Sequence, residues 1–190
     1  MKIGLFFGSF NPIHIGHLII ANTIADSGEV SQVWLVVSPQ NPFKKNSTLL
    51  HEFDRYDMVR LAIADNEKLN VTDIEFHLSK PSYTIDTLTY LQEKYSQHEF
   101  KIIIGEDNLK GFEKWKNHTK ILEYFEVLVY PRPNAAVTPF HTHEKVKFVK
   151  APLIDLSATY IREKIRNNQS IKYLVHEDVA TLIRVKGFYL

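Results

Sequence analysis

The sequence predicts an α/β fold of the Rossmann-like, doubly wound type, with a mostly parallel sheet and helices on both faces. Short apolar runs alternate along the chain with segments of helical periodicity. Several of these runs are continuously apolar, as expected of strands buried on both faces of a parallel sheet. The length of 190 residues fits one domain, and we expect its C-terminal part, from about residue 157 to residue 190, to be helical.

The expected elements alternate over most of the chain. The expected strands are 3–7, 32–38, 71–76, 100–104, 127–130 and 146–149. The expected helices are 15–25, 53–65, 84–94, 108–115, 119–124, 159–166 and 176–186, and a polar loop is expected over 134–145. In parallel sheets of this kind, ligands bind at the carboxyl ends of the strands. We therefore expect the functional residues in the segments that follow the strands.

Composition and charge exclude several classes of protein. The chain has no cysteine, which excludes disulfides, a thiol nucleophile and cysteine-based zinc or iron–sulfur sites. Lys and Arg number 23 against 22 Asp and Glu, so we expect no nucleic-acid partner. No apolar run approaches the ~20 residues that span a bilayer, and the apolar N-terminal stretch is too short for a signal-peptide core. We therefore expect a cytoplasmic protein that does not bind membranes.

The segment 8–17, which follows the first expected strand, is the most informative one. It joins a buried strand to a helix, where backbone N–H groups and the helix dipole attract an anion. His14 and His17 are three residues apart and share a face on the first helical turn. Gly8 permits close backbone approach, and Gly16 has no side chain that would obstruct a phosphate. The spacing predicts a polyphosphate site in which both imidazoles donate hydrogen bonds to oxygens that gain charge.

Two other interpretations of this histidine pair are a pair of ordinary cap residues and a metal site. The pair lacks a nearby third ligand, and helical zinc pairs usually lie four residues apart, so we expect no metal ligation by protein side chains. A second histidine pair, His141 and His143, lies in a polar loop. We interpret it as solvated rather than metal-binding.

A second candidate phosphate segment opens the helix expected at 159–166. Ser157 and Thr159 offer hydroxyl and N–H groups at the start of this helix, and Arg162 lies one turn later. An arginine in that position can clamp phosphate oxygens through two parallel hydrogen bonds. The alternative is a Ser/Thr helix cap followed by a solvated arginine, because capping is a common role of these residues.

These two segments together resemble the signatures of the HxGH nucleotidyltransferase superfamily. Gly-Ser-Phe-Asn-Pro-Ile-His-Ile-Gly-His at 8–17 has the form GSFxPxHxGH, and 156–162 resembles ISSTxIR, with Leu156 and Ala158 as departures. The superfamily transfers a nucleotidyl group from a triphosphate, with loss of pyrophosphate, on a Rossmann-like sheet. The resemblance, together with the placement of an acidic residue after a strand, implies an ATP site made of Gly8, Ser9, Phe10, Gly16, Gly105, Asp107, Ser157 and Thr159.

Further motifs resemble one branch of that superfamily, the nicotinate-nucleotide adenylyltransferases. The segment 39–44 is similar to the branch's PxxxPHK loop, with Phe43 where the branch has histidine and with Lys44 retained. The string Pro-Ser-Tyr-Thr-Ile-Asp-Thr-Leu at 81–88 and the pattern I-G-x-D-x-L at 104–109, followed by Trp115, are close matches. The segment 54–62 resembles the branch's R-x-x-M-x-x-L-A helix, which we interpret as mostly core packing. The resemblance covers nearly the whole chain.

The resemblance implies the reaction of ATP with nicotinate mononucleotide to give deamido-NAD and pyrophosphate. Mg²⁺ on the triphosphate would then act with the catalytic residues His14, His17, Lys44 and Arg162 to spread the charge of the transferred group. The amides of Tyr83 and Thr84 at a helix start would hold a carboxylate, Trp115 would stack on the pyridine ring, and Lys116 would add positive charge. The plainer alternatives are a solvated Lys44, a capping Asp107 and a core Trp115.

Three other functions stay open at this point. A nicotinamide-mononucleotide adenylyltransferase and a phosphopantetheine adenylyltransferase belong to the same class, although the latter lacks the Pro-Ser-Tyr-Thr string. A non-catalytic nucleotide-sensing module would keep the fold, but the phosphate motifs of this chain are intact. The sequence also leaves open a homo-oligomer and the preference between acid and amide mononucleotides.

Overall fold

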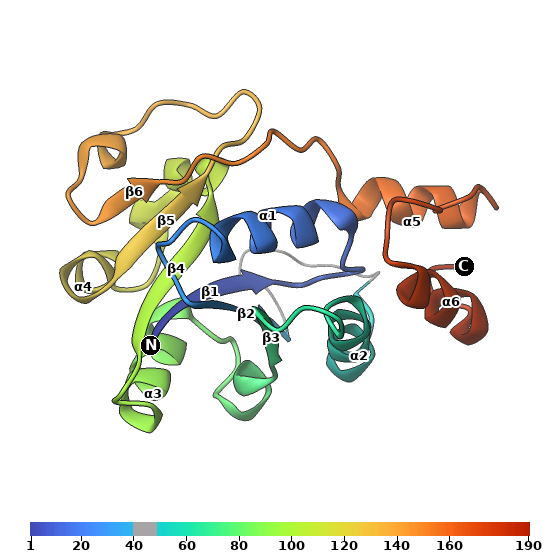
Figure 1. The fold of residues 1–190 in the computed structure, drawn as a ribbon, viewed down its shortest axis with the longest axis horizontal. Coiled ribbons are helices and arrows are strands. Elements are labelled where there is room, and N and C mark those ends of the chain that lie inside the picture. The colour runs from blue at the N-terminus through green and yellow to red at the C-terminus, as the bar shows by residue number, and fades with distance from the viewer. Residues whose placement is uncertain (40–48) are drawn as a thin grey trace.

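A six-stranded parallel sheet lies at the centre of the computed structural model, which describes residues 1–39 and 49–190. The strand order is β3-β2-β1-β4-β5-β6 (Figure 1). The strands are β1 (Lys2–Gly8), β2 (Gln32–Val37), β3 (Leu69–Thr72), β4 (Glu99–Gly105), β5 (Glu126–Tyr130) and β6 (Val146–Phe148). The order reverses between β1 and β4, which makes the sheet doubly wound and confirms the predicted fold class.

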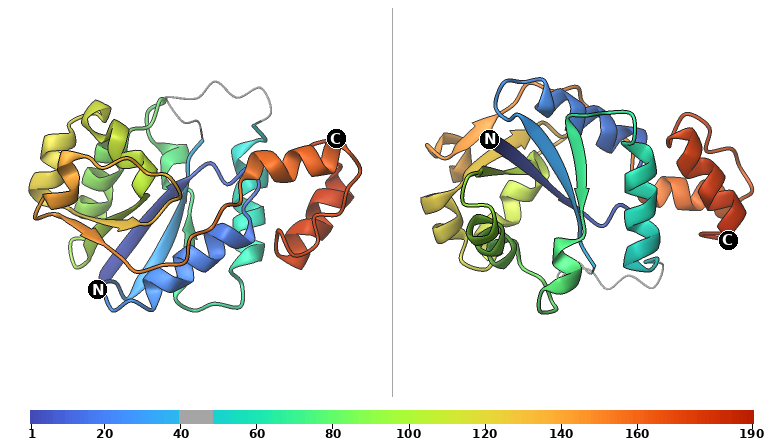
Figure 2. Two further views of the ribbon diagram at one scale, coloured as in Figure 1. Left: turned by 90° about the horizontal axis from the view of Figure 1, so that it is seen from above. Right: turned by 60° about the horizontal axis from the view of Figure 1, so that its bottom comes forward.

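Helices cover both faces of the sheet. The α-helices are α1 (Ile15–Ala25), α2 (Glu52–Ala62), α3 (Thr84–Lys94), α4 (His118–Tyr124), α5 (Ala158–Arg166) and α6 (Glu177–Lys186). Short 3₁₀ helices are η1 (Ile74–His77), η2 (Glu106–Lys114) and η3 (Pro139–Thr142). The helices α5 and α6 lie at one end of the molecule, with the start of α5 close to the start of α1 (Figures 1 and 2).

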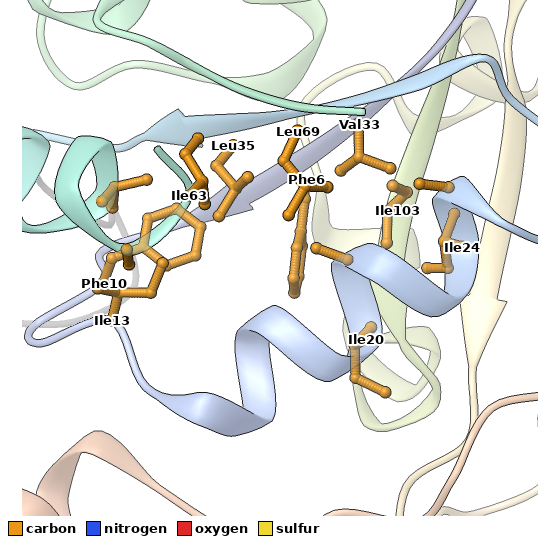
Figure 3. Packing of buried hydrophobic residues seen from close by; sticks show 14 of the residues in the cluster. Phe6, Phe10, Ile13, Ile20, Ile24, Val33, Leu35, Ile63, Leu69 and Ile103 are labelled. Atoms are coloured by element: carbon orange, nitrogen blue, oxygen red, sulfur yellow. The ribbon is translucent and has the colours of Figure 1, made fainter. Parts of the chain in front are cut away.

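Two apolar clusters, one on each face of the sheet, form the core. Alternating residues of one strand enter different clusters: Phe6 of β1 packs in the first, and Leu5 packs in the second, as the period of two in a strand requires. The first cluster includes side chains of α1, α2, α5 and α6, and Figure 3 shows part of it between the sheet and α1. The second includes side chains of α3, η2 and α4. Both faces are therefore buried, as the continuous apolar strands predicted.

Most element boundaries agree with the predictions, and those of α1 and α3 agree at both ends. The strand predicted over 71–76 is wrong at both ends, because β3 covers Leu69–Thr72 and η1 covers Ile74–His77. β3 is the outermost strand on its side of the sheet and pairs only with Val33–Val36 of β2, so its ladder ends with that partner. The helix predicted over 53–65 ends at Ala62, and the one predicted over 108–115 is the 3₁₀ helix η2.

Arg55 of α2 fixes the chain segments that leave β1 and β2. Its side chain is fully buried and donates hydrogen bonds to the carbonyls of Ser9, Ser38 (2.7 Å), Pro39 (2.9 Å) and Leu50 (2.9 Å). Charged donors of this kind bind carbonyls more strongly than neutral ones. The helix that we interpreted as mostly core packing therefore also carries a polar centre that holds two loops next to the carboxyl edge of the sheet.

Within residues 1–39 and 49–190, no helix combines the length and apolarity needed to cross a membrane.

Replacing Arg55 by Met should lower the free energy of unfolding by about 3 kcal/mol, because buried carbonyls would lose charged hydrogen-bond donors. Urea denaturation monitored by circular dichroism measures this change. The matched control is Arg60→Met on the same helix, since Arg60 is exposed and forms only a surface ion pair with Asp57 at 3.6 Å. Equal losses in both variants would contradict the role assigned to Arg55.

Candidate active site

A cavity of about 190 Å³ opens at the carboxyl ends of β1 and β4, where the strand order reverses. It lies at the position where sheets of this class bind ligands. The wall combines the end of β1, the end of β4, the start of α3 and the end of η2. The residues predicted from the sequence that line it are Gly8, Ser9, Tyr83, Thr84, Gly105, Trp115 and Lys116.

The two histidines lie together at the start of α1. His14 is the N-cap residue, and its ring stacks on the ring of His17 with centroids 3.6 Å apart and planes at 25°. The backbone N–H of His14 donates to Nδ1 of His17 (3.3 Å). Since Nδ1 of His17 accepts this bond, its neutral ring carries the proton on Nε2. Nε2 is therefore left as a hydrogen-bond donor.

Both histidines are neutral near pH 7. Burial lowers the pKa of His14 to about 4, and the positive charge of Arg132 adds to that effect. Burial also places the pKa of His17 well below 6.5, with further lowering by His14 and then by Arg132. A bound polyphosphate would act in the opposite direction, because a negative charge favours protonated imidazole. Nδ1 of His14 is buried and has no hydrogen-bond partner within the described parts of the chain.

The ring of Phe10 packs against the ring of His17. Phe10 is 2% exposed, and the two rings meet edge to face, at 5.1 Å and 79°. A Cβ atom on Gly8 would lie 2.7 Å from the Phe10 ring, so only glycine fits there without displacing it. The side chain of Phe10 therefore packs in the core, whereas Gly8 itself lines the cavity.

Gly16 allows a different close approach from the one we expected. A Cβ atom at this position would lie 2.9 Å from Cγ2 of Ile154 and 3.1 Å from the ring of His14. The space beside Gly16 is thus filled by the segment that leads into α5, not left clear for a phosphate. Glycine at this position lets the two predicted phosphate segments pack against each other.

Arg162 of α5 connects these two segments directly. Its NH1 group donates to the carbonyl of Asn11 (2.8 Å), and its NH2 group donates to Oγ1 of Thr159 (3.1 Å). Both terminal nitrogens thus donate to the protein itself, and the two-bond phosphate clamp stays a prediction. Nε of Arg162 is buried without a hydrogen-bond partner in the described residues. Ser157 caps α5 by accepting from the N–H of Tyr160 (3.2 Å).

Asn11 collects further contacts from two distant parts of the chain. Its Oδ1 atom accepts from the hydroxyl of Tyr189 (2.9 Å) and from the N–H of Leu50 (3.3 Å). Burial raises the pKa of the Tyr189 hydroxyl, which therefore remains protonated and able to donate. The β1–α1 loop is thus held by Arg162 of α5, by Leu50 before α2 and by Tyr189 near the C-terminal end.

The opposite side of the cavity contains the residues predicted to bind a pyridine ring and its carboxylate. Tyr83 is the N-cap residue of α3, so N–H groups of the first turn lack intrahelical partners. Trp115 packs on Phe112 with ring centroids 5.1 Å apart. Nζ of Lys116 lies 2.8 Å from the carboxylate of Asp86 and 4.7 Å from the centre of the Tyr83 ring. The charge of Lys116 is therefore partly neutralised by Asp86.

The predicted residues that do not line the cavity are His14, His17, Phe10, Gly16, Asp107, Ser157, Thr159 and Arg162. Asp107 is exposed and its Oδ1 atom is 3.6 Å from Nε of Arg132, whereas Gly105 beside it in sequence lines the cavity. Lys44 falls outside the residues that the structure describes.

Two charged residues of this region, Arg132 and Glu75, were not predicted from the sequence to have a role. Arg132 follows β5, donates from NH1 to the carbonyl of Ile154 (3.1 Å) and acts electrostatically on both histidines. Its position after the carboxyl end of a strand was the available signal. Glu75 is buried and lines the cavity. It fell inside the strand that we predicted over 71–76, where no local pattern indicated that its side chain is buried.

A histidine pair at the start of α1, in a segment that Arg162 ties to the start of α5 and that borders the cavity through Gly8 and Ser9, is the arrangement that the nucleotidyltransferase motifs predicted. A family model described as cytidylyltransferase-like matches residues 5–164. The fold is similar to that of Plasmodium falciparum nicotinic acid mononucleotide adenylyltransferase complexed with NaAD. That likeness covers 99% of this chain and 97% of the other, with a TM-score of 0.84 at 19% identity, and concerns the fold alone.

Similar bacterial sequences narrow this class. A protein of Cytophaga hutchinsonii is 58% identical over 189 residues, which are 100% of this chain and 98% of its own length. A protein of Flavobacterium psychrophilum is 48% identical over 191 residues, covering 100% of this chain and 99% of its own. Both carry the name "probable nicotinate-nucleotide adenylyltransferase". The chain belongs to the nicotinate-nucleotide adenylyltransferase family, which confirms the resemblance inferred from its motifs.

The lowered pKa of His14 predicts a pH dependence of stability. At pH values above 6.5 both the folded and the unfolded chain hold this ring neutral. Between pH 6.5 and about 4 only the unfolded chain binds the proton, so the free energy of unfolding falls by about 1.4 kcal/mol per pH unit as the pH falls. Between pH 7 and 5, urea denaturation should show the wild type losing about 2 kcal/mol more stability than His14→Asn. Equal losses would contradict the burial of a neutral His14.

Proposed function

We propose that the chain transfers the adenylyl group of ATP to nicotinate mononucleotide, forming deamido-NAD and releasing pyrophosphate in NAD biosynthesis. A phosphate oxygen of the mononucleotide bonds to the α-phosphorus of ATP, and the bond between that phosphorus and the bridging oxygen of the β-phosphate breaks. The observation that carries this proposal is the joining of the two phosphate motifs beside one cavity, through the hydrogen bond from Arg162 to Asn11. The names of the bacterial relatives support the choice of substrate.

This chemistry makes few demands on acid–base groups. The attacking phosphate is already ionised at neutral pH, so no general base and no serine or cysteine nucleophile is needed. The protein has to bring two anions together in line and stabilise the charge that develops. The neutral His17 ring suits this task, because its Nε2–H group can donate a hydrogen bond to a phosphate oxygen while the ring keeps its proton.

The ATP substrate carries a divalent cation in this proposal, and we take the cation to be Mg²⁺. Within the described residues, no group of three or more His, Cys, Asp or Glu side chains lies arranged to hold a metal ion. Mg²⁺ is commonly bound through substrate phosphates and water, so it would enter with ATP. His14, His17, Arg162 and the predicted Lys44 add positive or hydrogen-bonding groups around the same phosphates.

The nicotinate mononucleotide occupies the side of the cavity formed by α3 and η2. The first-turn N–H groups at Tyr83 and Thr84 bind the pyridine carboxylate, Trp115 stacks on the ring, and Lys116 adds charge. ATP occupies the side formed by the ends of β1 and β4 and extends beyond the cavity wall toward the start of α5. Ser9, Gly105, Asp107, Ser157 and Thr159 are proposed to bind it.

Pyrophosphate release in parallel assays tests this function. The purified chain is mixed with MgATP and, separately, with nicotinate mononucleotide, nicotinamide mononucleotide or phosphopantetheine. We expect release with nicotinate mononucleotide above all and its arrest by EDTA. Release with another acceptor would reassign the substrate, and ATP binding without release with any acceptor would indicate a nucleotide-sensing protein.

His17→Ala should lower kcat about 10²–10³-fold, which is the effect of removing one donor to the transition state. Steady-state pyrophosphate assays at saturating substrates measure it. His98→Ala is the control, because His98 lies next to the amino end of β4, at the opposite edge of the sheet. A kcat within a few-fold of the wild type would overturn the role assigned to His17.

Trp115→Ala should raise the KM for nicotinate mononucleotide about 3- to 10-fold, since an aromatic stacking contact is lost. The KM for ATP should stay within about twofold, because the two substrates occupy different sides of the cavity. Trp115→Phe, which keeps an aromatic ring, should fall between the two. An unchanged mononucleotide KM would rule out the stacking contact.

A further inference from the structure

Glu75 of η1 is a buried carboxyl group that faces the cavity. The residue is 2% exposed and lines the cavity wall. Its Oε2 atom accepts from the hydroxyl of Ser82 (3.1 Å), and its Oε1 atom accepts from the hydroxyl of Thr87 (2.9 Å). Both partner residues are themselves buried. The carboxyl group therefore makes two well-defined hydrogen bonds to side chains on either side of one helix start.

A third hydroxyl group, that of Ser38 after β2, also hydrogen-bonds to Glu75. Burial raises the pKa of the Glu75 carboxyl, and the three hydroxyl groups act against this effect. Within residues 1–39 and 49–190, no lysine, arginine or histidine forms an ion pair with it. Glu75 is thus built to accept hydrogen bonds from hydroxyl groups rather than to neutralise a cation.

Ser82 and Thr87 flank the N-terminal cap of α3. Ser82 comes directly before the N-cap residue Tyr83, and Thr87 lies one turn into the helix, where its N–H donates to the Tyr83 carbonyl (3.2 Å). Glu75 therefore holds the cap turn from both ends. Tyr83 and Thr84 in this turn line the cavity, so any shift of the turn would move its N–H groups relative to a bound ligand.

We propose that Glu75 is a positioning residue for the mononucleotide, which acts by fixing the first turn of α3 through Ser82 and Thr87. This inference rests on the proposed function, because it takes that turn as the binding site of the pyridine carboxylate. The Glu75 contacts join η1, α3 and the end of β2, whereas the segments joined by Arg162 lie at the starts of α1 and α5. The effect of Glu75 is accordingly confined to one of the two substrates.

Steady-state kinetics of three variants test the proposal. Glu75→Ala should raise the KM for nicotinate mononucleotide about tenfold or more, with kcat and the KM for ATP within about twofold. Glu75→Gln should raise it only about threefold, because the amide oxygen still accepts from one hydroxyl group. Thr87→Val, which removes one donor and keeps the shape of the side chain, should also raise it about threefold.

Thr89→Val is the matched control on the same helix. Its hydroxyl is on the exposed face and donates to the carbonyl of Ile85 (2.9 Å), not to Glu75. This variant should leave both KM values unchanged. Circular dichroism and urea denaturation of each variant verify that the chain is folded, and Glu75→Gln and Thr87→Val keep the test decisive if Glu75→Ala does not fold.

Two results would overturn the assignment: equal increases of both KM values, which indicate a general structural role, or no increase of either. A wild-type chain that releases no pyrophosphate with nicotinate mononucleotide would instead contradict the proposed function. The Glu75 assignment is then decided by calorimetry, which compares the Kd of nicotinate mononucleotide between the wild type and Glu75→Ala. A tenfold weaker Kd in the variant supports the assignment, and an equal Kd rejects it.

Discussion

The hydrogen bond from Arg162 to the carbonyl of Asn11 is the contact on which the arrangement of the site depends. It joins two segments that are 151 residues apart in the chain, and each of them alone is only a helix start with polar side chains. The side chain of Asn11 is held in turn by Leu50 and Tyr189. A loop fixed from several directions loses little further entropy when a ligand binds, and this preorganisation is what a transfer between two anions requires.

The predicted site residues are also divided between the two faces of the sheet. The histidine pair and Arg162 belong to elements that pack in the first apolar cluster, whereas Trp115 and Tyr83 pack against the second. The cavity lies between β1 and β4, and the segments that follow these two strands turn to opposite faces of the sheet. Each face can therefore hold a different substrate, with the reacting phosphates meeting at the strand ends. Burial of neutral histidines fits this arrangement, since they donate hydrogen bonds without adding a charge that must be desolvated.

The fold could be predicted from the sequence because its signals are local. Both α1 and α3 were predicted at their observed bounds, although the apolar 3.6-residue period is marked only in α3. The prediction failed at 71–76, where the end of β3 is decided by its pairing with β2 and not by its own residues. In the site, motifs located the histidines and seven residues that line the cavity, but not the buried contacts of Arg55 and Glu75. Those contacts join segments distant in sequence, so no local pattern reveals them.

A crystal structure with a non-hydrolysable ATP analogue and Mg²⁺ would show where the triphosphate binds. We expect it between the start of α1 and the start of α5, with a phosphate oxygen about 2.7–3.2 Å from Nε2 of His17 and the Trp115 side of the cavity unoccupied. A triphosphate bound away from the junction of these two helices, or one that leaves both imidazoles without contact, would contradict this arrangement.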